Sequence, residues 1–313
     1  MSLTATAAVA LAAVLDSLLG EPPTRVHPVA ILGRAIAWLD RDWALPRLAG
    51  LAIALCLPLG VGALATGIVA LASLVSASLA AGVAGLVLFA TISRRMLLEE
   101  GRAVVTASAT DLATARDRLP SLVGRDTSSL SPGEVRSAAV ESLAENLADG
   151  LVAPLVAFAL GALLALPVAA GAAAWVKAVN TLDSMVGYRD HPSGWASARL
   201  DDVVMLLPAR LTACCLAVAG ARPTALWRAR GLARRPASPN SGWPMATLAV
   251  VHDLVLRKPG AYVLPGVDGG RGGHADSVPA EDLPSLADAD RARRTVGRAG
   301  ICALLLAGVV AWF

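Results

Sequence analysis

The amino-acid sequence predicts an all-α fold, specifically a polytopic integral membrane helical bundle with cytoplasmic helical segments. Of the 313 residues, 56% are hydrophobic and only 16% are charged, whereas a soluble domain carries about 25% charged residues. No charged residue occurs from Leu48 to Ile92, and one membrane span needs only about 20 apolar residues. These features exclude a disordered chain, and we expect residues 1–313 to form a single membrane-embedded domain.

The apolar segments, taken in chain order, account for this expectation. Residues 48–92 are long enough for two spans joined by a tight turn. Residues 151–176 are interrupted by prolines and glycines, and a single crossing there would put Lys177–Asp202 outside the cell. We therefore expect either a re-entrant hairpin or a polar motif lining a deep cavity that opens to the cytoplasm. The complete set of apolar segments is residues 1–15, 48–92, 151–176, 203–221 and 299–313.

Arginine placement predicts the orientation of the chain. Arginines flank residues 48–92 on both sides, and arginine-rich flanks face the cytoplasm. The polar regions 93–150 and 222–298 are therefore expected in the cytoplasm, with a capping box at Ser131–Glu134 and a helix over Trp243–Leu256. The net charge is only +3, so we expect no nucleic-acid partner.

Three carboxylates recur at every fourth position, namely Glu141, Glu145 and Asp149. On a helix they would form one acidic stripe in which like charges repel one another. Mg²⁺ would relieve that repulsion, because it prefers carboxylate oxygens together with water and substrate phosphates. The alternative is a solvated helix face, but the stripe runs directly into an apolar segment.

A second polar face follows the apolar segment 151–176. Lys177, Asn180, Thr181 and Ser184 fall at positions i, i+3, i+4 and i+7. This spacing puts their side chains on one face of a helix. We expect that face, with the neighbouring Asp183, to belong to a functional site.

Arg210 stands inside the apolar segment 203–221, which begins directly after Asp201 and Asp202. A charge at bilayer depth costs about 2.5–3.5 kcal/mol on insertion scales, so such groups normally face the bundle interior and mark a function. The structural alternative is that Arg210 pairs with Asp201 or Asp202, or extends to the membrane surface.

Two further features suit phosphate binding or acid–base chemistry. Ser238–Gly242 is a small-residue loop ahead of Trp243, where free N–H groups at a helix start favour an anion. Ordinary N-capping by Ser241 would explain the same residues, and the sequence contains no G-x-x-x-x-G-K phosphate loop. His27 lies in a dense polar cluster near the N terminus and is either a base or a structural histidine.

Taken together, these motifs resemble the CobD/CbiB family, the adenosylcobinamide-phosphate synthases. The string NTLDSMVGY over Asn180–Tyr188 is the most specific of them. The matching stretches keep the family's order along nearly the whole chain. They are Leu15–Pro28 with Gly33-Arg34, Val123–Thr127, Ala139–Pro154, Asn180–Tyr188, Gly194–Asp202, Pro208–Leu211 and Ser238–Pro244.

The resemblance implies a multi-pass ligase of the inner (plasma) membrane with its active site facing the cytoplasm. Such an enzyme joins adenosylcobyric acid, a corrinoid, to (R)-1-aminopropan-2-yl phosphate or a related amino-alcohol phosphate, and gives adenosylcobinamide phosphate. Its cofactors would be ATP and Mg²⁺. Its partners would be the two organic substrates, the lipid bilayer and other membrane-bound enzymes that assemble the nucleotide loop.

An amide ligase must activate a carboxylate, most simply as an acyl phosphate made from ATP, so we assign roles to the acidic and cationic residues as hypotheses. The catalytic candidates are His27, Glu141, Glu145, Lys177, Asp183, Asp201 and Asp202. The candidate Mg²⁺ ligands are Glu141, Glu145, Asp149, Asp201 and Asp202. The candidates for substrate and phosphate binding are Arg125, Asn146, Asn180, Ser184, Arg199, Arg210, Ser238, Asn240 and Ser241.

The sequence departs from the family pattern at three places. Met205 stands where the family usually has Asn, and Met245 stands where a Glu usually follows Trp-Pro. The linker Arg189–Ser193 is shorter than usual and lacks the customary Glu and aromatic residues.

Two other classes of protein remain open. A transporter would explain several spans with intramembrane charges, but it would predict inverted repeats, which the sequence does not show. A non-catalytic membrane sensor or scaffold, like a related family implicated in β-lactamase regulation, is the second alternative. Retention of the acidic candidates and Lys177 argues against a degenerate scaffold.

Overall fold

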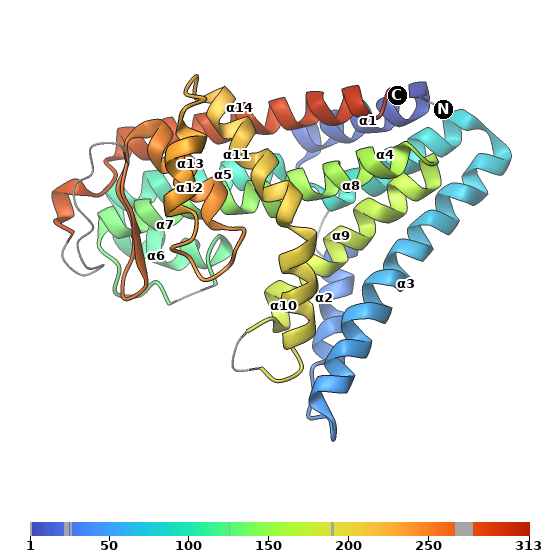
Figure 1. Ribbon diagram of the computed structural model, residues 1–313, viewed down its shortest axis with the longest axis horizontal. Coiled ribbons are helices and arrows are strands. Elements are labelled where there is room, and N and C mark those ends of the chain that lie inside the picture. Colours follow the sequence, from blue (N-terminus) through green and yellow to red (C-terminus); the bar gives the residue numbers. More distant parts are fainter. Residues whose placement is uncertain (1, 22–24, 26, 125, 189–190, 267–277) are drawn as a thin grey trace. The chain divides into compact units, whose positions relative to one another are not determined.

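The computed structural model is almost entirely helical and confirms the predicted all-α class (Figure 1). The structure describes residues 2–21, 25, 27–124, 126–188, 191–266 and 278–313. The described β structure is one antiparallel hairpin, in which β1 (Leu256–Lys258) pairs with β2 (Tyr262–Leu264). Backbone contacts divide the chain into two compact units, a division that is not visible in the sequence. The first unit holds residues 1–93, 149–208 and 304–313, and the second holds residues 94–148 and 209–303.

The first unit is organised around one central helix, α9 (Leu166–Val186), which packs mainly against five other helices of that unit. These five are α2 (Pro28–Leu39), α3 (Pro46–Val75), α4 (Ala77–Thr91), α8 (Ala153–Ala162) and α10 (Trp195–Val204). The remaining helix, α1 (Ser2–Leu19), lies mainly against α4. It also meets the C-terminal end of the chain, because the Thr6 hydroxyl donates to the Gly308 carbonyl at 3.2 Å.

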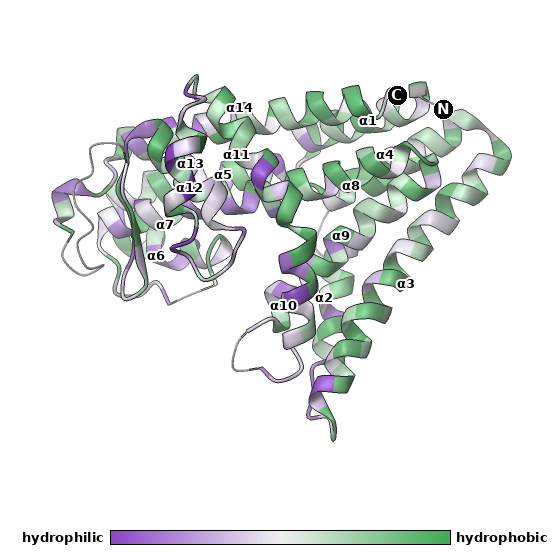
Figure 2. Ribbon diagram, in the orientation of Figure 1, coloured by the Kyte–Doolittle hydropathy of each residue, from purple (hydrophilic) through white to green (hydrophobic). Residues whose placement is uncertain are grey.

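The apolar run 48–92 forms two helices, as predicted. The break falls at Ser76, whose extended backbone ends α3 and whose hydroxyl accepts from Leu79 N at 3.1 Å to cap α4. Ribbons α3 and α4 are hydrophobic along most of their length (Figure 2). Leu59, Leu71 and Leu74 of α3 are exposed, which suits a face that lies against lipid.

Residues 151–176 do not form one straight helix. After α8, a turn at residues 163–165 reverses the chain, and α8 packs directly against α9. Gly161 makes this close return possible, because a Cβ at that position would lie 2.7 Å from Ala169 Cα. The segment is therefore a helix, a turn and a second helix rather than one continuous helix. Its re-entry from the cytoplasm stays a prediction.

Three helices are long and apolar enough to cross a membrane in the described part of the chain: Pro46–Val75, Ala77–Thr110 and Pro132–Ala162. A fourth candidate is the pair α10 and α11 (Leu206–Ala219), which bends by 48° at Met205. The terminal apolar segments belong to α1 and to the end of α14 (Leu286–Val310). The protein is therefore a polytopic helical membrane protein.

The second unit combines the polar helices with the β-hairpin. Its helices are α5 (Arg94–Thr110), α6 (Leu112–Arg118), α7 (Pro132–Leu147), α11 from Ala209, α12 (Ala225–Leu232), α13 (Gly242–His252) and α14 as far as Ala303. Helix α7 packs against α5, α13 and β1. The predicted capping box is present, because Ser131 and Glu134 exchange hydrogen bonds at the start of α7. The predicted helix to Leu256 was too long: α13 ends at His252, where Asp253 adopts a left-handed φ of 57° and the chain turns into β1.

We predict that Gly171 is essential for the packing of α9 against α3. A Cβ at Gly171 would lie 1.9 Å from Thr66 Oγ1 and 2.8 Å from the Gly62 carbonyl oxygen. The Gly171→Ala variant should therefore lose about 1–3 kcal/mol of stability through overpacking. Thermal unfolding in detergent measures this loss. Gly67→Ala is the control, since a Cβ at Gly67 meets nothing within 4 Å, and equal stability of the two variants would contradict the prediction.

Candidate functional site

In the first unit, α9 carries a lysine into a group of ionisable residues. Lys177 is partly buried and interacts electrostatically with Asp149 and Glu21. Burial lowers the pKa of Lys177, and the two carboxylates oppose that shift. An ammonium removed from water is costly unless acidic groups compensate it. Lysines in such surroundings lose a proton more readily than exposed ones, which is typical of functional lysines.

His27 belongs to the same group. Its Nδ1 accepts a hydrogen bond from Val29 N at 3.1 Å and caps α2, while Nε2 lies 3.9 Å from a Glu21 carboxylate oxygen. Burial lowers the pKa of His27, Glu21 opposes the shift and Lys177 reinforces it. The capping bond occupies the Nδ1 lone pair, so the neutral ring carries its proton on Nε2, on the side that faces Glu21.

Ser93 connects Glu21 to the turn that carries Asp149. Its hydroxyl donates to Glu21, and its backbone N–H donates to the Gly150 carbonyl at 2.8 Å. Gly150 and Asp149 lie in a π-helical turn (Ala148–Val152) between α7 and α8. Turns of this kind occur frequently at functional sites. Glu21 and Ser93 were not predicted as site residues, because their contacts join segments that are far apart in the sequence.

A second acidic pair lies at the C-terminal end of α9. Burial and the nearby Asp202 raise the pKa of Asp183 to about 6. Arg199, one turn before Asp202 on α10, approaches it at 3.6 Å. Gly187 is required beside this pair, because a Cβ there would lie 1.9 Å from Asp183 Oδ1. Two carboxylates that repel each other in a half-buried position favour a bound cation.

The short linker before α10 is held to the turn after α2. His191 Nε2 lies 2.9 Å from Asp40 Oδ1, and Ser193 Oγ lies 2.8 Å from His191 Nδ1. Gly50 permits the approach, since a Cβ there would lie 1.9 Å from the Ser193 carbonyl oxygen. Arg189 lies outside the described residues.

In the second unit, Glu141 is buried and held by protein donors. It is 4% exposed, the Ser137 hydroxyl donates to Oε1 at 2.9 Å, and the Tyr262 hydroxyl donates to Oε2 at 2.8 Å. The Tyr262 hydroxyl also lies 3.7 Å from Met245 Sδ. The sequence analysis missed Tyr262, because the β-hairpin that brings it to α7 was not predicted.

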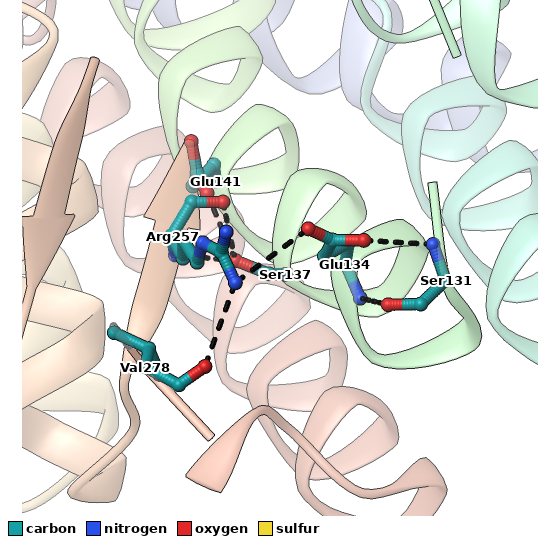
Figure 3. Close-up of polar contacts among 6 residues, drawn as sticks. All are labelled: Ser131, Glu134, Ser137, Glu141, Arg257 and Val278. Atoms are coloured by element: carbon teal, nitrogen blue, oxygen red, sulfur yellow. Dashed lines mark hydrogen bonds and ion pairs between the residues drawn. The ribbon is translucent and has the colours of Figure 1, made fainter. Parts of the chain in front are cut away.

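Arg257 of β1 connects the hairpin to the polar side of α7 (Figure 3). Its backbone N–H donates to Ser137 Oγ at 2.7 Å, and its guanidinium lies 3.8 Å from Glu134. The same guanidinium donates to the Val278 carbonyl at 3.5 Å. The figure shows Glu134, Ser137 and Glu141 following one another along α7, with Arg257 beside them. This network holds Glu141 in one orientation.

Arg210 lies close to the predicted phosphate loop. Its guanidinium donates to the Asn240 side chain and to the Pro239 carbonyl at 3.3 Å, and it lies 5.2 Å from the centre of the Trp243 ring. Ser238 Oγ accepts from Asn240 N at 3.2 Å. In the described structure the side chain of Ser241 makes no capping bond to α13. The start of α13 therefore brings together four predicted phosphate-binding residues, Arg210, Ser238, Asn240 and Ser241. A phosphate site would require such an arrangement.

Two of the remaining predicted site residues donate hydrogen bonds to nearby backbone carbonyls. Asn146 donates to the Leu122 carbonyl at 3.2 Å, and Ser184 donates to the Thr181 carbonyl at 3.0 Å. Glu145, Asn180 and Asp201 are partly buried. Arg125 lies outside the described residues.

The acidic stripe is not one regular helical face. The α-helical spacing ends at Leu147, and Asp149 lies in the π-helical turn. Among the described residues, no group of three or more His, Cys, Asp or Glu side chains is arranged to hold a metal ion. The Mg²⁺ ligand set stays a prediction.

Comparisons with known proteins agree with the motifs. The CobD/Cbib protein family matches residues 9–289. The "Probable cobalamin biosynthesis protein CobD" of Methanothermobacter thermautotrophicus is 39% identical over 81% of this chain and 84% of the relative. A protein of the same description from Methanothrix thermoacetophila is 33% identical over 96% of this chain and 95% of the relative. The "Cobalamin biosynthesis protein CobD" of Klebsiella pneumoniae is 39% identical over 80% of this chain and 81% of the relative. No solved structure matches.

The fold and the site define a helical membrane protein that buries ionisable side chains between its helices. Ionisable side chains inside a membrane protein are costly and normally mark a functional site. The chain belongs to the CobD/CbiB family, a family of cobalamin biosynthesis enzymes. The resemblance seen in the sequence is thereby confirmed.

We predict that Tyr262 stabilises the second unit through Glu141. The Tyr262→Phe variant removes one hydrogen bond to a buried carboxylate and should lower the free energy of unfolding by about 1.5–3 kcal/mol. Tyr188→Phe is the matched control, because the Tyr188 hydroxyl is exposed and donates only to the Ser184 carbonyl at 3.2 Å. Thermal unfolding compares the two variants, and equal melting temperatures would refute this role for Tyr262.

We predict that Asp183 destabilises the fold at neutral pH. Folding raises its pKa to about 6 from 3.8, so the folded state favours the protonated form and loses stability as the pH rises from about 4 to 6. The Asp183→Asn variant should therefore melt at a higher temperature than the unmodified protein at pH 7.5, and the difference should shrink towards pH 4. Asp117→Asn, which changes an exposed carboxylate on α6, is the control. A pH-independent difference for Asp183→Asn would contradict the prediction.

Proposed function

We propose that this protein is an ATP-dependent amide ligase of the plasma membrane. It joins adenosylcobyric acid to (R)-1-aminopropan-2-yl phosphate, or a related amino-alcohol phosphate, and releases adenosylcobinamide phosphate. Family membership supports the pathway. The observation that carries the reaction is the partly buried Lys177, which lies with Asp149, Glu21 and His27 between the helices of the first unit. A ligase needs such cations for phosphate groups and acids or bases for proton transfer.

The chemistry requires two steps. A propionate oxygen of the corrinoid takes the terminal phosphoryl group of ATP, which releases ADP and leaves an acyl phosphate. The amine of the second substrate then attacks the acyl carbon, the C–N bond forms, and inorganic phosphate leaves. The amine enters as an ammonium, so a base must accept protons before and during the attack. The Glu21 carboxylate is such a base, and the neutral His27 ring, which carries its proton on Nε2, lies 3.9 Å from it and would stabilise its charge.

Two groups of residues suit the phosphate groups. Lys177 offers an ammonium whose charged form is favoured by Asp149 and Glu21. Arg210 offers a guanidinium at the start of α13, beside Ser238, Asn240 and Ser241. Charge-assisted hydrogen bonds from such donors are about twice as strong as neutral ones. We assign Lys177 to the amino-alcohol phosphate and the Arg210 group to a second phosphate.

Mg²⁺ fits the acidic pair at the end of α9. The ion usually needs only one or two protein carboxylates, because water and substrate phosphates complete its shell. Asp183 and Asp202 provide two carboxylates whose repulsion a cation would relieve, and Asp201 is adjacent. Bound Mg²⁺ would neutralise the transferring phosphoryl group. We place this site on the cytoplasmic side, where ATP and the other enzymes of nucleotide-loop assembly are available.

We predict that Lys177 contributes to binding of the amino-alcohol phosphate. Detergent-solubilised protein should convert adenosylcobyric acid to the amide, detected by mass, only with Mg-ATP and aminopropyl phosphate present. The Lys177→Met variant should raise the KM for aminopropyl phosphate by about tenfold to a hundredfold, because one charge-assisted contact is worth about 1.5–3 kcal/mol. The KM for ATP should change less.

Lys258→Met is the matched control, because Lys258 is the other lysine of the chain and lies on β1 of the second unit. It should leave both KM values unchanged. If folded protein forms no amide with any amino-alcohol phosphate, the ligase proposal is wrong, and a membrane sensor or scaffold becomes the better account. Net movement of the corrinoid across sealed vesicles without ATP use would instead favour a transporter.

A further inference from the structure

We propose that α12 and the turn after it form a binding surface for anionic phospholipid headgroups. The α12 basic surface consists of Trp227, Arg228, Arg230 and Arg234, all of which are exposed. It belongs to the second unit alone, and none of its residues is assigned to the proposed ligase site.

The charge of this part of the chain has one sign. No Asp or Glu occurs between Asp202 and Asp253. The arginines in that interval are Arg210, Arg222, Arg228, Arg230, Arg234 and Arg235. Elsewhere in the same unit, exposed arginines such as Arg294 pair with carboxylates of their own helix. Within the described residues, none of the three arginines on the α12 basic surface makes an ion pair, so their charge is available to an external anion.

The helix is held so that these side chains face outward. Ala225, Ala229 and Ala233 are at most 1% exposed, and α12 packs on α13 through Ala225 with Val250 and Val251. Arginines outside the surface secure both ends of the segment. Arg222 donates to the Val250 carbonyl at 2.9 Å, and Arg235 donates to the Val263 carbonyl at 2.6 Å. The outward arginines are therefore presented on a fixed backbone, which lowers the entropic cost of binding.

Trp227 indicates that the external anion belongs to a lipid. The side chain is 77% exposed, and Arg230 lies over its ring at 5.9 Å. Tryptophan is enriched at the membrane–water interface, where its ring contacts the acyl boundary and its N–H stays among headgroups. A site for a free nucleotide or phosphate would instead be concave and would cover such a ring.

The position of α12 in the chain supports the same ligand. Helix α12 begins soon after α11, which together with α10 forms a candidate membrane span. Arginine clusters directly beside a membrane span attract anionic lipids, with a contribution from each arginine. The α12 basic surface thus combines an aromatic anchor with unpaired cations at a membrane boundary.

The test uses the full-length protein in nanodiscs of phosphatidylcholine with increasing phosphatidylglycerol. The contribution of Trp227 is the fluorescence difference between the unmodified protein and the Trp227→Phe variant. Brominated phosphatidylglycerol should quench this contribution more strongly than brominated phosphatidylcholine at equal total lipid. Excess quenching is the quenching by brominated phosphatidylglycerol beyond that by brominated phosphatidylcholine. In the Arg228→Gln variant, reaching half of the maximal excess quenching should need a phosphatidylglycerol fraction about fivefold higher. Higher salt should weaken the preference, because the attraction is electrostatic.

Matched variants separate the surface from net charge. R228Q/R230Q/R234Q should abolish the preference, whereas R228K/R230K/R234K should keep it, since headgroup attraction needs only positive charge. The control R118Q/R291Q/R294Q removes the same charge from arginines that pair with Glu100, Asp288 and Asp290, and it should keep the preference. The proposal is overturned if unmodified protein shows no preference, if the control loses it equally, or if inorganic phosphate abolishes it at constant ionic strength.

Discussion

Burial of Lys177 is the constraint on which the first unit depends. An ammonium placed between apolar helices must have acidic partners, because the interior offers no water to compensate its charge. Asp149 and Glu21 supply that compensation from segments far apart in the sequence. Their positions in turn require the π-helical turn before α8 and the contacts of Ser93 with Glu21 and Gly150. The polar group and the helix arrangement therefore depend on each other.

Close helix packing makes this arrangement possible. Small residues line the contacts of α9, where Gly171 lies against Gly62 and Thr66 of α3, and Ala169 lies against Gly161 of α8. In a membrane, helices associate through such close contacts rather than through exclusion of water. The second unit uses a different principle, because Arg257 and Tyr262 of a β-hairpin reach the polar side of α7 and fix Glu141. Each unit thus holds its carboxylates by its own set of contacts.

Several features of the fold could be predicted from local patterns. Residues 48–92 formed two helices because their length exceeds one span and Ser76 can end one helix and cap the next. The capping box at Ser131 and Glu134 was recognisable for the same reason, since its hydrogen bonds join residues three positions apart. The helix predicted to reach Leu256 ended at His252 instead, because a left-handed residue at Asp253 and the pairing of Leu256 with Leu264 decide that boundary. Strand pairing is a non-local contact, and no periodicity over the helix reports it.

The sequence by itself determined the helical membrane class and the family, because composition, hydrophobic run length and motif order are properties of the chain. Only the tertiary structure decided which polar residues meet. It joined His27 and Lys177 to Glu21 and Asp149, and it brought Arg210 to Asn240 and Trp243. It also showed that Glu141 is satisfied by Ser137 and Tyr262 within the second unit, whereas Asp149 lies in the first. The physical reason is that charge compensation and hydrogen bonding act over a few ångströms in space, whatever the separation of the partners along the chain.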